Sequence, residues 1–212
     1  MTFSPKDAAD ACINKSRKLL DLASRSLPIA DVCDDLCRYA LLTAVTSIDT
    51  YMHWLVFSRL SEVRHRVDLP KSLAQVEIPF SALVTLADSA ISAQQNDTTI
   101  RPWVQLKNTL QSQLLDKTFQ SYDQVAGAFA LAGIEKPWAK VAKELGVQAS
   151  DIKQRLDKLV HRRNQIAHEG DIMRMSRPRN MRFNPVDDAL VTKDVDWVEN
   201  LLNAMQAVVA AE

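Results

Sequence analysis

Glycine is scarce in this sequence: the 212-residue chain contains only 4. Regular alternation of apolar and polar residues, the pattern of a half-buried strand, is also scarce, and the two features together favour helices. The same shortage excludes several enzyme classes, because phosphate-binding loops, dinucleotide-binding turns and the strained turn of a serine nucleophile need glycine at fixed positions. The zinc-binding pattern His-Glu-x-x-His is absent as well. We therefore predict an all-α protein with no metal and no cofactor.

An excess of charge of one sign is also missing. The 26 lysines and arginines balance the 26 aspartates and glutamates, so the formal net charge is +0. No global electrostatic attraction draws such a chain to nucleic acid or to a membrane. Any site for a polyanion must therefore be a local patch.

The chain also lacks the features of a secreted or membrane protein. Its three cysteines, Cys12, Cys33 and Cys37, match neither a disulfide framework nor the spacing of a zinc site. Charges interrupt every apolar run that could span a membrane. Residues 1–6 lack the apolar run of a signal peptide. These absences predict a cytoplasmic protein that has no membrane among its partners.

The length fits a single domain over residues 1–212. We expect an N-terminal helix over about 5–26, with Ser4 before it and Pro5 at its first position. A long helix over 32–60 is apolar nearly all round its middle, so it should be the central helix of a bundle whose core spans about 31–171. Shorter helices are expected at 80–93, 103–130 (broken near 116–122) and 138–145. A further helix, capped by Ser150 or Asp151, should end near Glu169. A loop over 173–191 should then lead to a C-terminal helix over about 194–210 that is capped by Thr192 or Asp194.

One arginine lies where the hydrophobic pattern predicts an apolar residue. When the helix from residue 151 is projected at about 100° per residue, one face is apolar and holds Ile152, Leu156, Leu159, Val160, Ile166 and Ala167. Arg163 falls at the centre of this stripe. A guanidinium stays charged and is costly to bury without a partner. Arg163 must therefore meet a carboxylate of this fold, a partner subunit or an anionic ligand, or extend its charge to solvent.

Two further polar residues lie beside Arg163. Asn164 and His168 are four residues apart and line one edge of the stripe, and His161 projects to the same edge. This set suits phosphodiester chemistry on RNA without a metal: histidine can move a proton near neutral pH, and arginine can stabilise the charge on a pentacovalent phosphate. An amide can position an oxygen, and RNA supplies its own nucleophile, the 2′-hydroxyl. Arg163, Asn164 and His168 are the candidate catalytic residues, and His161 is a supporting residue or a bystander.

The long helix carries one further candidate. Asp49 lies one turn before His53, and its face is close to that of Arg38. Asp49 is therefore a core residue paired with Arg38 or His53, or it orients Arg163. We favour the structural role.

These residues resemble a known family. Arg163 to His168 looks like the Arg-x4–6-His motif of HEPN domains, and Asn164 matches the polar residue that usually follows the arginine. The resemblance to the RiboL-PSP-HEPN branch is carried by the runs LVHRRNQIAHEGD (159–171), AVTSIDTYMH (44–53) and KPW (136–138), and it covers most of 31–171. The variant with a tyrosine two residues after the histidine, which is linked to antitoxin adenylylation, is not matched because Glu169 and Gly170 follow His168 here.

The resemblance implies a HEPN-type helical bundle that pairs as a homodimer, in which two copies of the motif form one composite ribonuclease site. Many members are metal-independent endoribonucleases of toxin–antitoxin or antiphage defence systems, so RNA and an antitoxin or defence-system protein are the implied partners. Other HEPN domains are non-catalytic scaffolds that bind a partner protein or nucleotide, which is the alternative function. A third interpretation is a helical structural subunit in which Arg163 pairs with an acidic residue.

A basic segment follows the motif directly. Residues 173–183 contain Arg174, Arg177, Arg179 and Arg182 and no acidic residue, and Pro178 prevents a continuous helix. Since the net charge is +0, this loop is the best candidate for holding RNA phosphates. The other interpretation is a solvated surface loop.

Overall fold

The computed structural model describes residues 3–25, 30–63, 69–96, 102–174 and 180–212. Within these ranges the chain is helical apart from its connections and one isolated antiparallel bridge between Ile172 and Phe183, so the all-α prediction is confirmed. The helices are α1 (Pro5–Arg25), α2 (Ala30–Glu62), α3 (Lys71–Ala74), α4 (Phe80–Gln95), α5 (Pro102–Leu115), α6 (Tyr122–Leu131), α7 (Pro137–Leu145), α8 (Ala149–Glu169) and α9 (Asp188–Ala210). No helix in the described part of the chain is long and apolar enough to cross a membrane.

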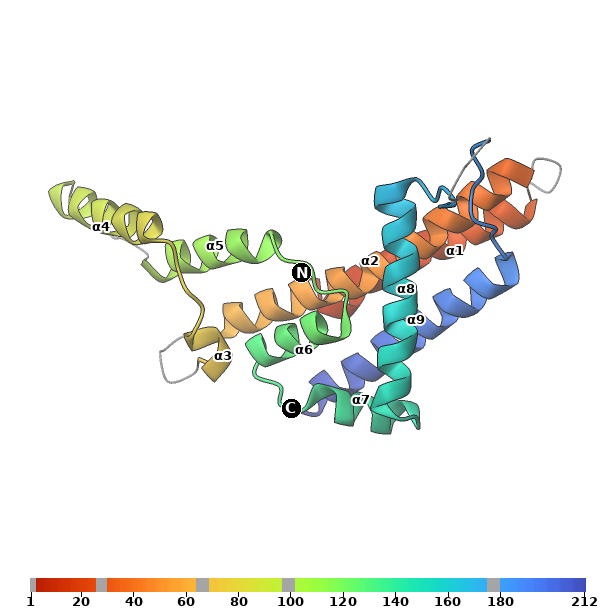
Figure 1. Cartoon of the computed structure of the whole chain (residues 1–212). Helices are drawn as coiled ribbons and strands as arrows, with labels where there is room; N and C mark the ends of the chain where they lie inside the picture. The colour runs from red at the N-terminus through yellow and green to blue at the C-terminus, as the bar shows by residue number, and fades with distance from the viewer. Residues whose placement is uncertain (1–2, 26–29, 64–68, 97–101, 175–179) are drawn as a thin grey trace.

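The first two helices form an antiparallel hairpin around which the rest is built (Figure 1). The start of α1 follows the expected pattern, because Ser4 and Asp7 accept hydrogen bonds from each other's backbone N–H at 3.1 and 3.0 Å. Small residues let the two helices approach closely: Ala9 is fully buried, and the buried Ser16 hydroxyl donates to the Ala40 carbonyl at 2.7 Å. Helix α9 packs against both helices of the hairpin.

Helix α2 is the central element, as its nearly uniform apolar pattern predicts. Its fully buried positions, on several sides of the helix, include Ala44, Ile48, Tyr51 and Met52. Tyr51 is the clearest case, since its ring lies in the core while its hydroxyl donates to Gln206 Oε1 of α9 at 3.1 Å. Helices α1, α5, α6, α8 and α9 all pack on α2.

Helices α6 and α7 lead the chain into α8. Ser121 caps α6 and exchanges hydrogen bonds with Gln124, which explains why the predicted break near 116–122 occurs. The KPW run then starts α7: Trp138 stacks on Tyr122 with ring centroids 4.4 Å apart, and its indole N–H donates to the Tyr122 carbonyl at 3.0 Å. Gly146 ends α7 in the left-handed conformation, with φ of 67°.

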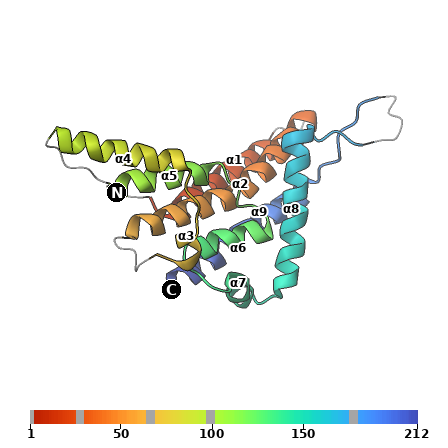
Figure 2. The same ribbon diagram turned by 60° about the vertical axis from the view of Figure 1, so that its left-hand side comes forward.

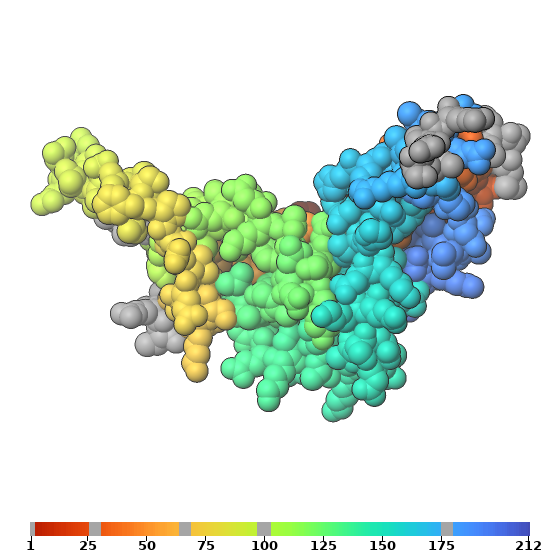
Figure 3. Space-filling model, viewed as in Figure 1, coloured from red at the N-terminus to blue at the C-terminus, as the bar shows by residue number. Residues whose placement is uncertain are grey.

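Helix α8 crosses α2 at a steep angle, and the two turned views agree on this (Figures 1 and 2). Its N-terminal half is held by the buried residues Ile152, Leu156 and Leu159. At the other side of the molecule, α4 packs on α5 and stands off the body as an arm, which Figure 3 shows in outline.

The expected boundaries of two helices were wrong. Helix α9 begins at Asp188, and its cap is Asp187, whose carboxylate accepts from the Leu190 N–H at 3.0 Å, not Thr192 or Asp194. The loop after the motif is therefore shorter than 173–191. Helix α8 begins at Ala149, so Asp151 lies inside its first turn and accepts from the N–H of Gln148, outside the helix, at 3.3 Å.

The position of α8 should depend on Leu156, which is fully buried. We expect Leu156→Ala to lower the free energy of unfolding by about 2–5 kcal/mol, because the truncation leaves a cavity under the helix. Urea unfolding followed by circular dichroism measures this. Leu83→Ala is the matched control, since Leu83 is 45% exposed on α4, and it should change stability by less than about 0.5 kcal/mol.

Candidate functional site

The predicted motif lies in the last two turns of α8, beyond the point where the helix is buried. Leu159 is the last buried residue of the stripe, whereas Val160, Arg163 and Ile166 are half-buried and Ala167 is exposed. The apolar stripe therefore continues past the part that the described residues bury. Arg163 lies in the middle of the uncovered end.

The three candidate catalytic side chains contact one another. Nη1 of Arg163 donates to Oδ1 of Asn164 at 3.0 Å and lies 3.3 Å from Nε2 of His168. A guanidinium can only donate hydrogen bonds. A hydrogen bond between these two groups therefore requires an unprotonated His168 Nε2, with the ring proton on Nδ1. In this form Nε2 could remove a proton from a hydroxyl.

Arg163 itself is incompletely satisfied. Its Nε is shielded from solvent and has no hydrogen-bond partner among the described residues, and no carboxylate of those residues pairs with its guanidinium. An unmade hydrogen bond of a buried charged group costs about 1–3 kcal/mol or more. The interpretation of Arg163 as one half of a structural ion pair is thus not supported by the described residues.

The ion pair is made instead by the neighbouring residue, Arg162. Both terminal nitrogens of Arg162 bind the Asp171 carboxylate, Nη2 at 2.8 Å. Asp171 is 1% exposed and also accepts from Arg38 Nε at 2.6 Å and from Asn184 Nδ2 at 2.9 Å. Residues from α2, from α8 and from the segment before α9 therefore meet at one buried carboxylate, which we call the Asp171 cluster. The sequence analysis did not identify it.

The backbone around Asp171 completes this arrangement. Gly170 ends α8 in the left-handed conformation with φ of 61°, and Asp171 follows with φ of 57°. The Asp171 N–H donates to the Gln165 carbonyl at 3.0 Å, and its carbonyl accepts from the Asn184 N–H at 2.9 Å. The end of α8, which carries His168, is thereby fixed to the chain that returns to α9.

The Asp171 cluster controls the charge of its carboxylate. Burial raises the pKa of Asp171, but hydrogen bonds from Arg38, Asn184 and Arg162 outweigh this effect and hold the pKa below its usual value of 3.8. Asp171 is therefore ionised at neutral pH and neutralises one of the two arginines that contact it.

The basic segment after the motif is described only in part. Its two arms pair through the hydrogen bond from the Met173 N–H to the Arg182 carbonyl, at 2.7 Å. Arg174 forms an ion pair at 2.7 Å with Glu169, the residue after His168, and Arg182 is exposed. Arg177 and Arg179 lie outside the described residues.

The other two candidates occupy different positions. Asp49 does not orient Arg163 and does not pair with Arg38: its carboxylate accepts from the Phe119 N–H at 2.5 Å and lies 3.6 Å from His53 Nε2. Its preferred structural role thus matches these contacts. His161 is exposed on α8, one to two turns before His168.

The site offers no metal-binding cluster within the described part of the chain, where no three His, Cys, Asp or Glu side chains converge as ligands would. Its chemistry is that of a cation, an amide and an imidazole at an open helix end. Such a set can bind an anionic oxygen and move a proton.

Comparison with known proteins gives one match. The sequence profile of RiboL-PSP-HEPN matches residues 11–210, nearly the whole chain. No curated protein and no solved structure matches the chain significantly.

The Asp171 cluster makes a testable contribution to stability. Because the pKa of Asp171 is lowered in the folded state, its stabilising effect should be complete well above pH 3.8 and lost as the pH falls through the folded-state pKa. We expect Asp171→Asn to lower the free energy of unfolding by about 3 kcal/mol at pH 7, since it removes the buried carboxylate shared by the buried Arg38 and the half-buried Arg162.

Urea unfolding at pH 7, 5 and 3 measures both effects. The difference in free energy of unfolding between the wild-type protein and Asp171→Asn should become smaller below pH 4. Asp157→Asn, an exposed carboxylate on the same helix, is the control. A difference that is equal at all three pH values would contradict the assignment of the stabilising charge to Asp171.

Proposed function

Because this chain belongs to the RiboL-PSP-HEPN family, we propose that it is a metal-independent endoribonuclease whose active residues are Arg163, Asn164 and His168. The observation that carries the proposal is the direct contact of Arg163 with both other side chains at the open end of α8. A non-catalytic scaffold, the alternative, has no chemical need for all three groups in contact.

The unsatisfied Nε of Arg163 supports an anionic substrate at this place. The guanidinium contacts Asn164 and His168, and its Nε has no hydrogen-bond partner among the described residues. A phosphate group that draws the guanidinium outward would receive two parallel N–H donors. The binding of phosphate would then release His168 for proton transfer.

The reaction that fits these groups is attack of the RNA 2′-hydroxyl on the adjacent phosphorus. His168 Nε2 takes the hydroxyl proton while the bond from the 2′-oxygen to phosphorus forms, and Arg163 stabilises the charge on the phosphate oxygens. The bond from phosphorus to the 5′-oxygen breaks, and that oxygen receives a proton. The products are a 2′,3′-cyclic phosphate and a 5′-hydroxyl.

The uncovered stripe supports a two-fold dimer as the active form. Val160 is only half-buried and Ala167 is exposed beside Arg163, and a second copy of α8 would cover them. A dimer would bring two His168 side chains to one site, so that one could remove the first proton and the other could supply the second. The partner of such an enzyme in the cell would be an antitoxin or another defence-system protein.

The first prediction of this proposal concerns catalysis. His168→Ala should lower RNA cleavage by about 10²–10⁴-fold, the usual contribution of a general acid or base. Arg163→Ala should also lose activity, and Arg163→Lys should restore it only in part because the planar fork is lost. The measurement is cleavage of total RNA and of tRNA in EDTA, with His161→Ala as the control that stays active. Full activity of both alanine variants, or a strict requirement for magnesium, would contradict the proposal.

The second prediction concerns assembly. Light scattering at micromolar concentration should show a dimer, and Ala167→Cys should form an intermolecular disulfide under mild oxidation because residue 167 lies near the two-fold axis. Ser112→Cys, exposed on α5, is the control and should remain unlinked. A strict monomer in solution would exclude the composite site.

The third prediction concerns RNA binding by the basic segment. Arg177→Ala combined with Arg179→Ala should weaken RNA binding, and it should flatten the salt dependence by about 1 or slightly less for each lost phosphate contact. The rate of cleavage at saturating RNA should change little. Filter binding at several salt concentrations tests this. An unchanged salt slope would assign the segment to structure or to a protein partner.

A further inference from the structure

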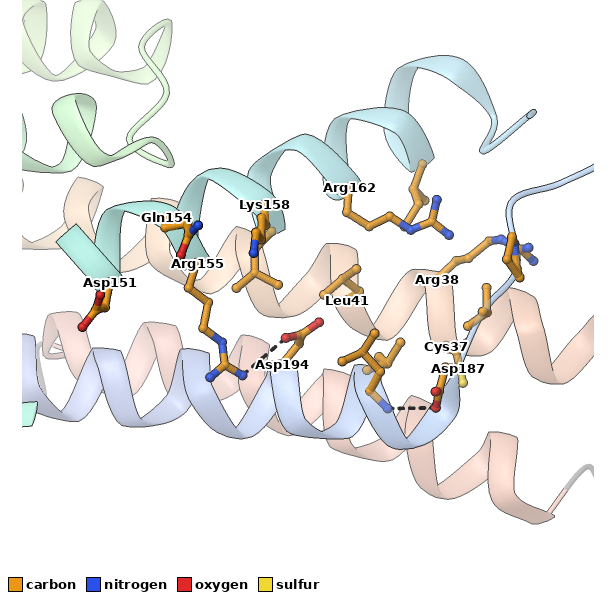
Figure 4. Close-up of a pocket in the computed structure, with 16 residues that line it drawn as sticks. Cys37, Arg38, Leu41, Asp151, Gln154, Arg155, Lys158, Arg162, Asp187 and Asp194 are labelled. Atoms are coloured by element: carbon orange, nitrogen blue, oxygen red, sulfur yellow. Dashed lines mark hydrogen bonds and ion pairs between the residues drawn. The ribbon is translucent and has the colours of Figure 1, made fainter. Parts of the chain in front are cut away.

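A groove runs along the edge of α8 that carries Arg155, Lys158 and Arg162 (Figure 4). It has a volume of about 580 Å³ and lies between α8 and α9, with α2 beneath. Its floor and rim are aliphatic and consist of Leu41, Leu159, Ile166, Val186, Leu190 and Val191. No aromatic residue is among the described residues that line it.

The described part of the chain does not fill this groove. Helix α8 packs on α2 and α7, and α9 packs on α1, α2 and α7, so the two helices face each other across the groove. Leu190 on the rim is 55% exposed, although it lies in a helix that buries most of its other large apolar residues. An aliphatic groove with an exposed leucine on its rim is a typical surface for a protein partner.

The two walls of the groove have opposite charge. The wall from α8 carries Arg155, Lys158 and Arg162, with Asp151 near its N-terminal end, and so has a net positive charge. The opposite wall carries Asp187, just before α9, and Asp194. Arg155 reaches across to Asp194 at 3.4 Å, whereas Lys158 has no hydrogen-bond or ion-pair partner among the described residues. Burial raises the pKa of Asp194 more than its ion pair with Arg155 lowers it.

This pattern disfavours RNA as the occupant. Carboxylates on one wall repel phosphates, and the described residues of the lining include no ring on which a base could stack. It also disfavours a small anion, because most of the lining is apolar. A polypeptide with an apolar face and charged edges matches the floor and both walls together.

We propose that the groove between α8 and α9 is the docking site for an amphipathic helix of a partner protein, with acidic residues on the edge that faces α8 and basic residues on the edge that faces α9. The groove follows α8 from Asp151 to Ile166, which is about 22 Å, or about four turns of a helix. The volume of the groove suits one row of apolar side chains from the partner helix, spaced three and four residues apart. The backbone of the partner helix would then lie above the groove.

This site goes beyond the proposed ribonuclease and does not depend on it. Lys158 and Ile166 lie on a different side of α8 from Asn164 and His168, so a docked helix leaves the motif open to RNA. Arg38 and Arg162 both line the groove and bind Asp171, so they connect the groove with the end of α8 that carries the motif.

A display selection with matched counter-selection tests the proposal. The library consists of helical peptides of about 16 residues with a fixed leucine stripe and with Glu or Lys allowed at each edge position. Peptides are selected on the wild-type protein and counter-selected on Leu190→Asp. We expect the enriched peptides to carry Glu along one edge and Lys along the other. Absence of enrichment over the counter-selection, or enrichment of peptides with one charge on both edges, would overturn the proposal.

The selected peptides are then measured individually by fluorescence anisotropy. Leu190→Asp should weaken binding by at least about tenfold, and Lys158→Glu should weaken it as well. Leu83→Asp on α4, the matched control at a similarly exposed leucine, should leave binding unchanged. If Leu190→Asp instead lowers the affinity for labelled single-stranded RNA, or converts a dimer into a monomer, the occupant is RNA or a second copy and the proposal is wrong.

Discussion

The placement of the motif depends on one buried carboxylate. Asp171 accepts hydrogen bonds from an arginine of α2 and an arginine of α8, and it binds Asn184 through its side chain and its backbone. Without this cluster, the end of α8 would be held mainly by the half-buried Val160 and Ile166, because the fully buried stripe ends at Leu159. The Asp171 cluster thus fixes the C-terminal half of α8 to the rest of the fold, whereas the buried Ile152 and Leu156 fix the N-terminal half.

The helical architecture was largely predictable because each signal for it is local. The break before α6 follows from Ser121 and Gln124, and the central position of α2 follows from its uniform apolar pattern. The start of α9 was not predictable from local signals, since Asp187, Thr192 and Asp194 are all good capping residues. Burial decides among them: Val191 and Val195 are both buried, which requires the helix to begin earlier.

The candidate site was predictable in its local part and not in its long-range part. The mutual contacts of Arg163, Asn164 and His168 follow from their spacing on one helix. The role of Asp171 does not, because Arg38 lies 133 residues away in the sequence. A signal was nevertheless present, because Arg38 is a charged residue in an apolar helix. From the sequence, Asp49 was considered as its partner, whereas in the structure Arg38 binds Asp171, the acidic residue after Gly170.

The sequence separation within the Asp171 cluster has a consequence for synthesis of the protein. Its members lie at positions 38, 162, 171 and 184, so the cluster cannot close on the ribosome until residue 184 has left the exit tunnel. A nascent chain that already displays Arg163 and His168 still lacks the contacts that fix the end of α8. The end of α8 is therefore fixed late in translation, and until then the emerging chain cannot present a rigid Arg163–His168 motif.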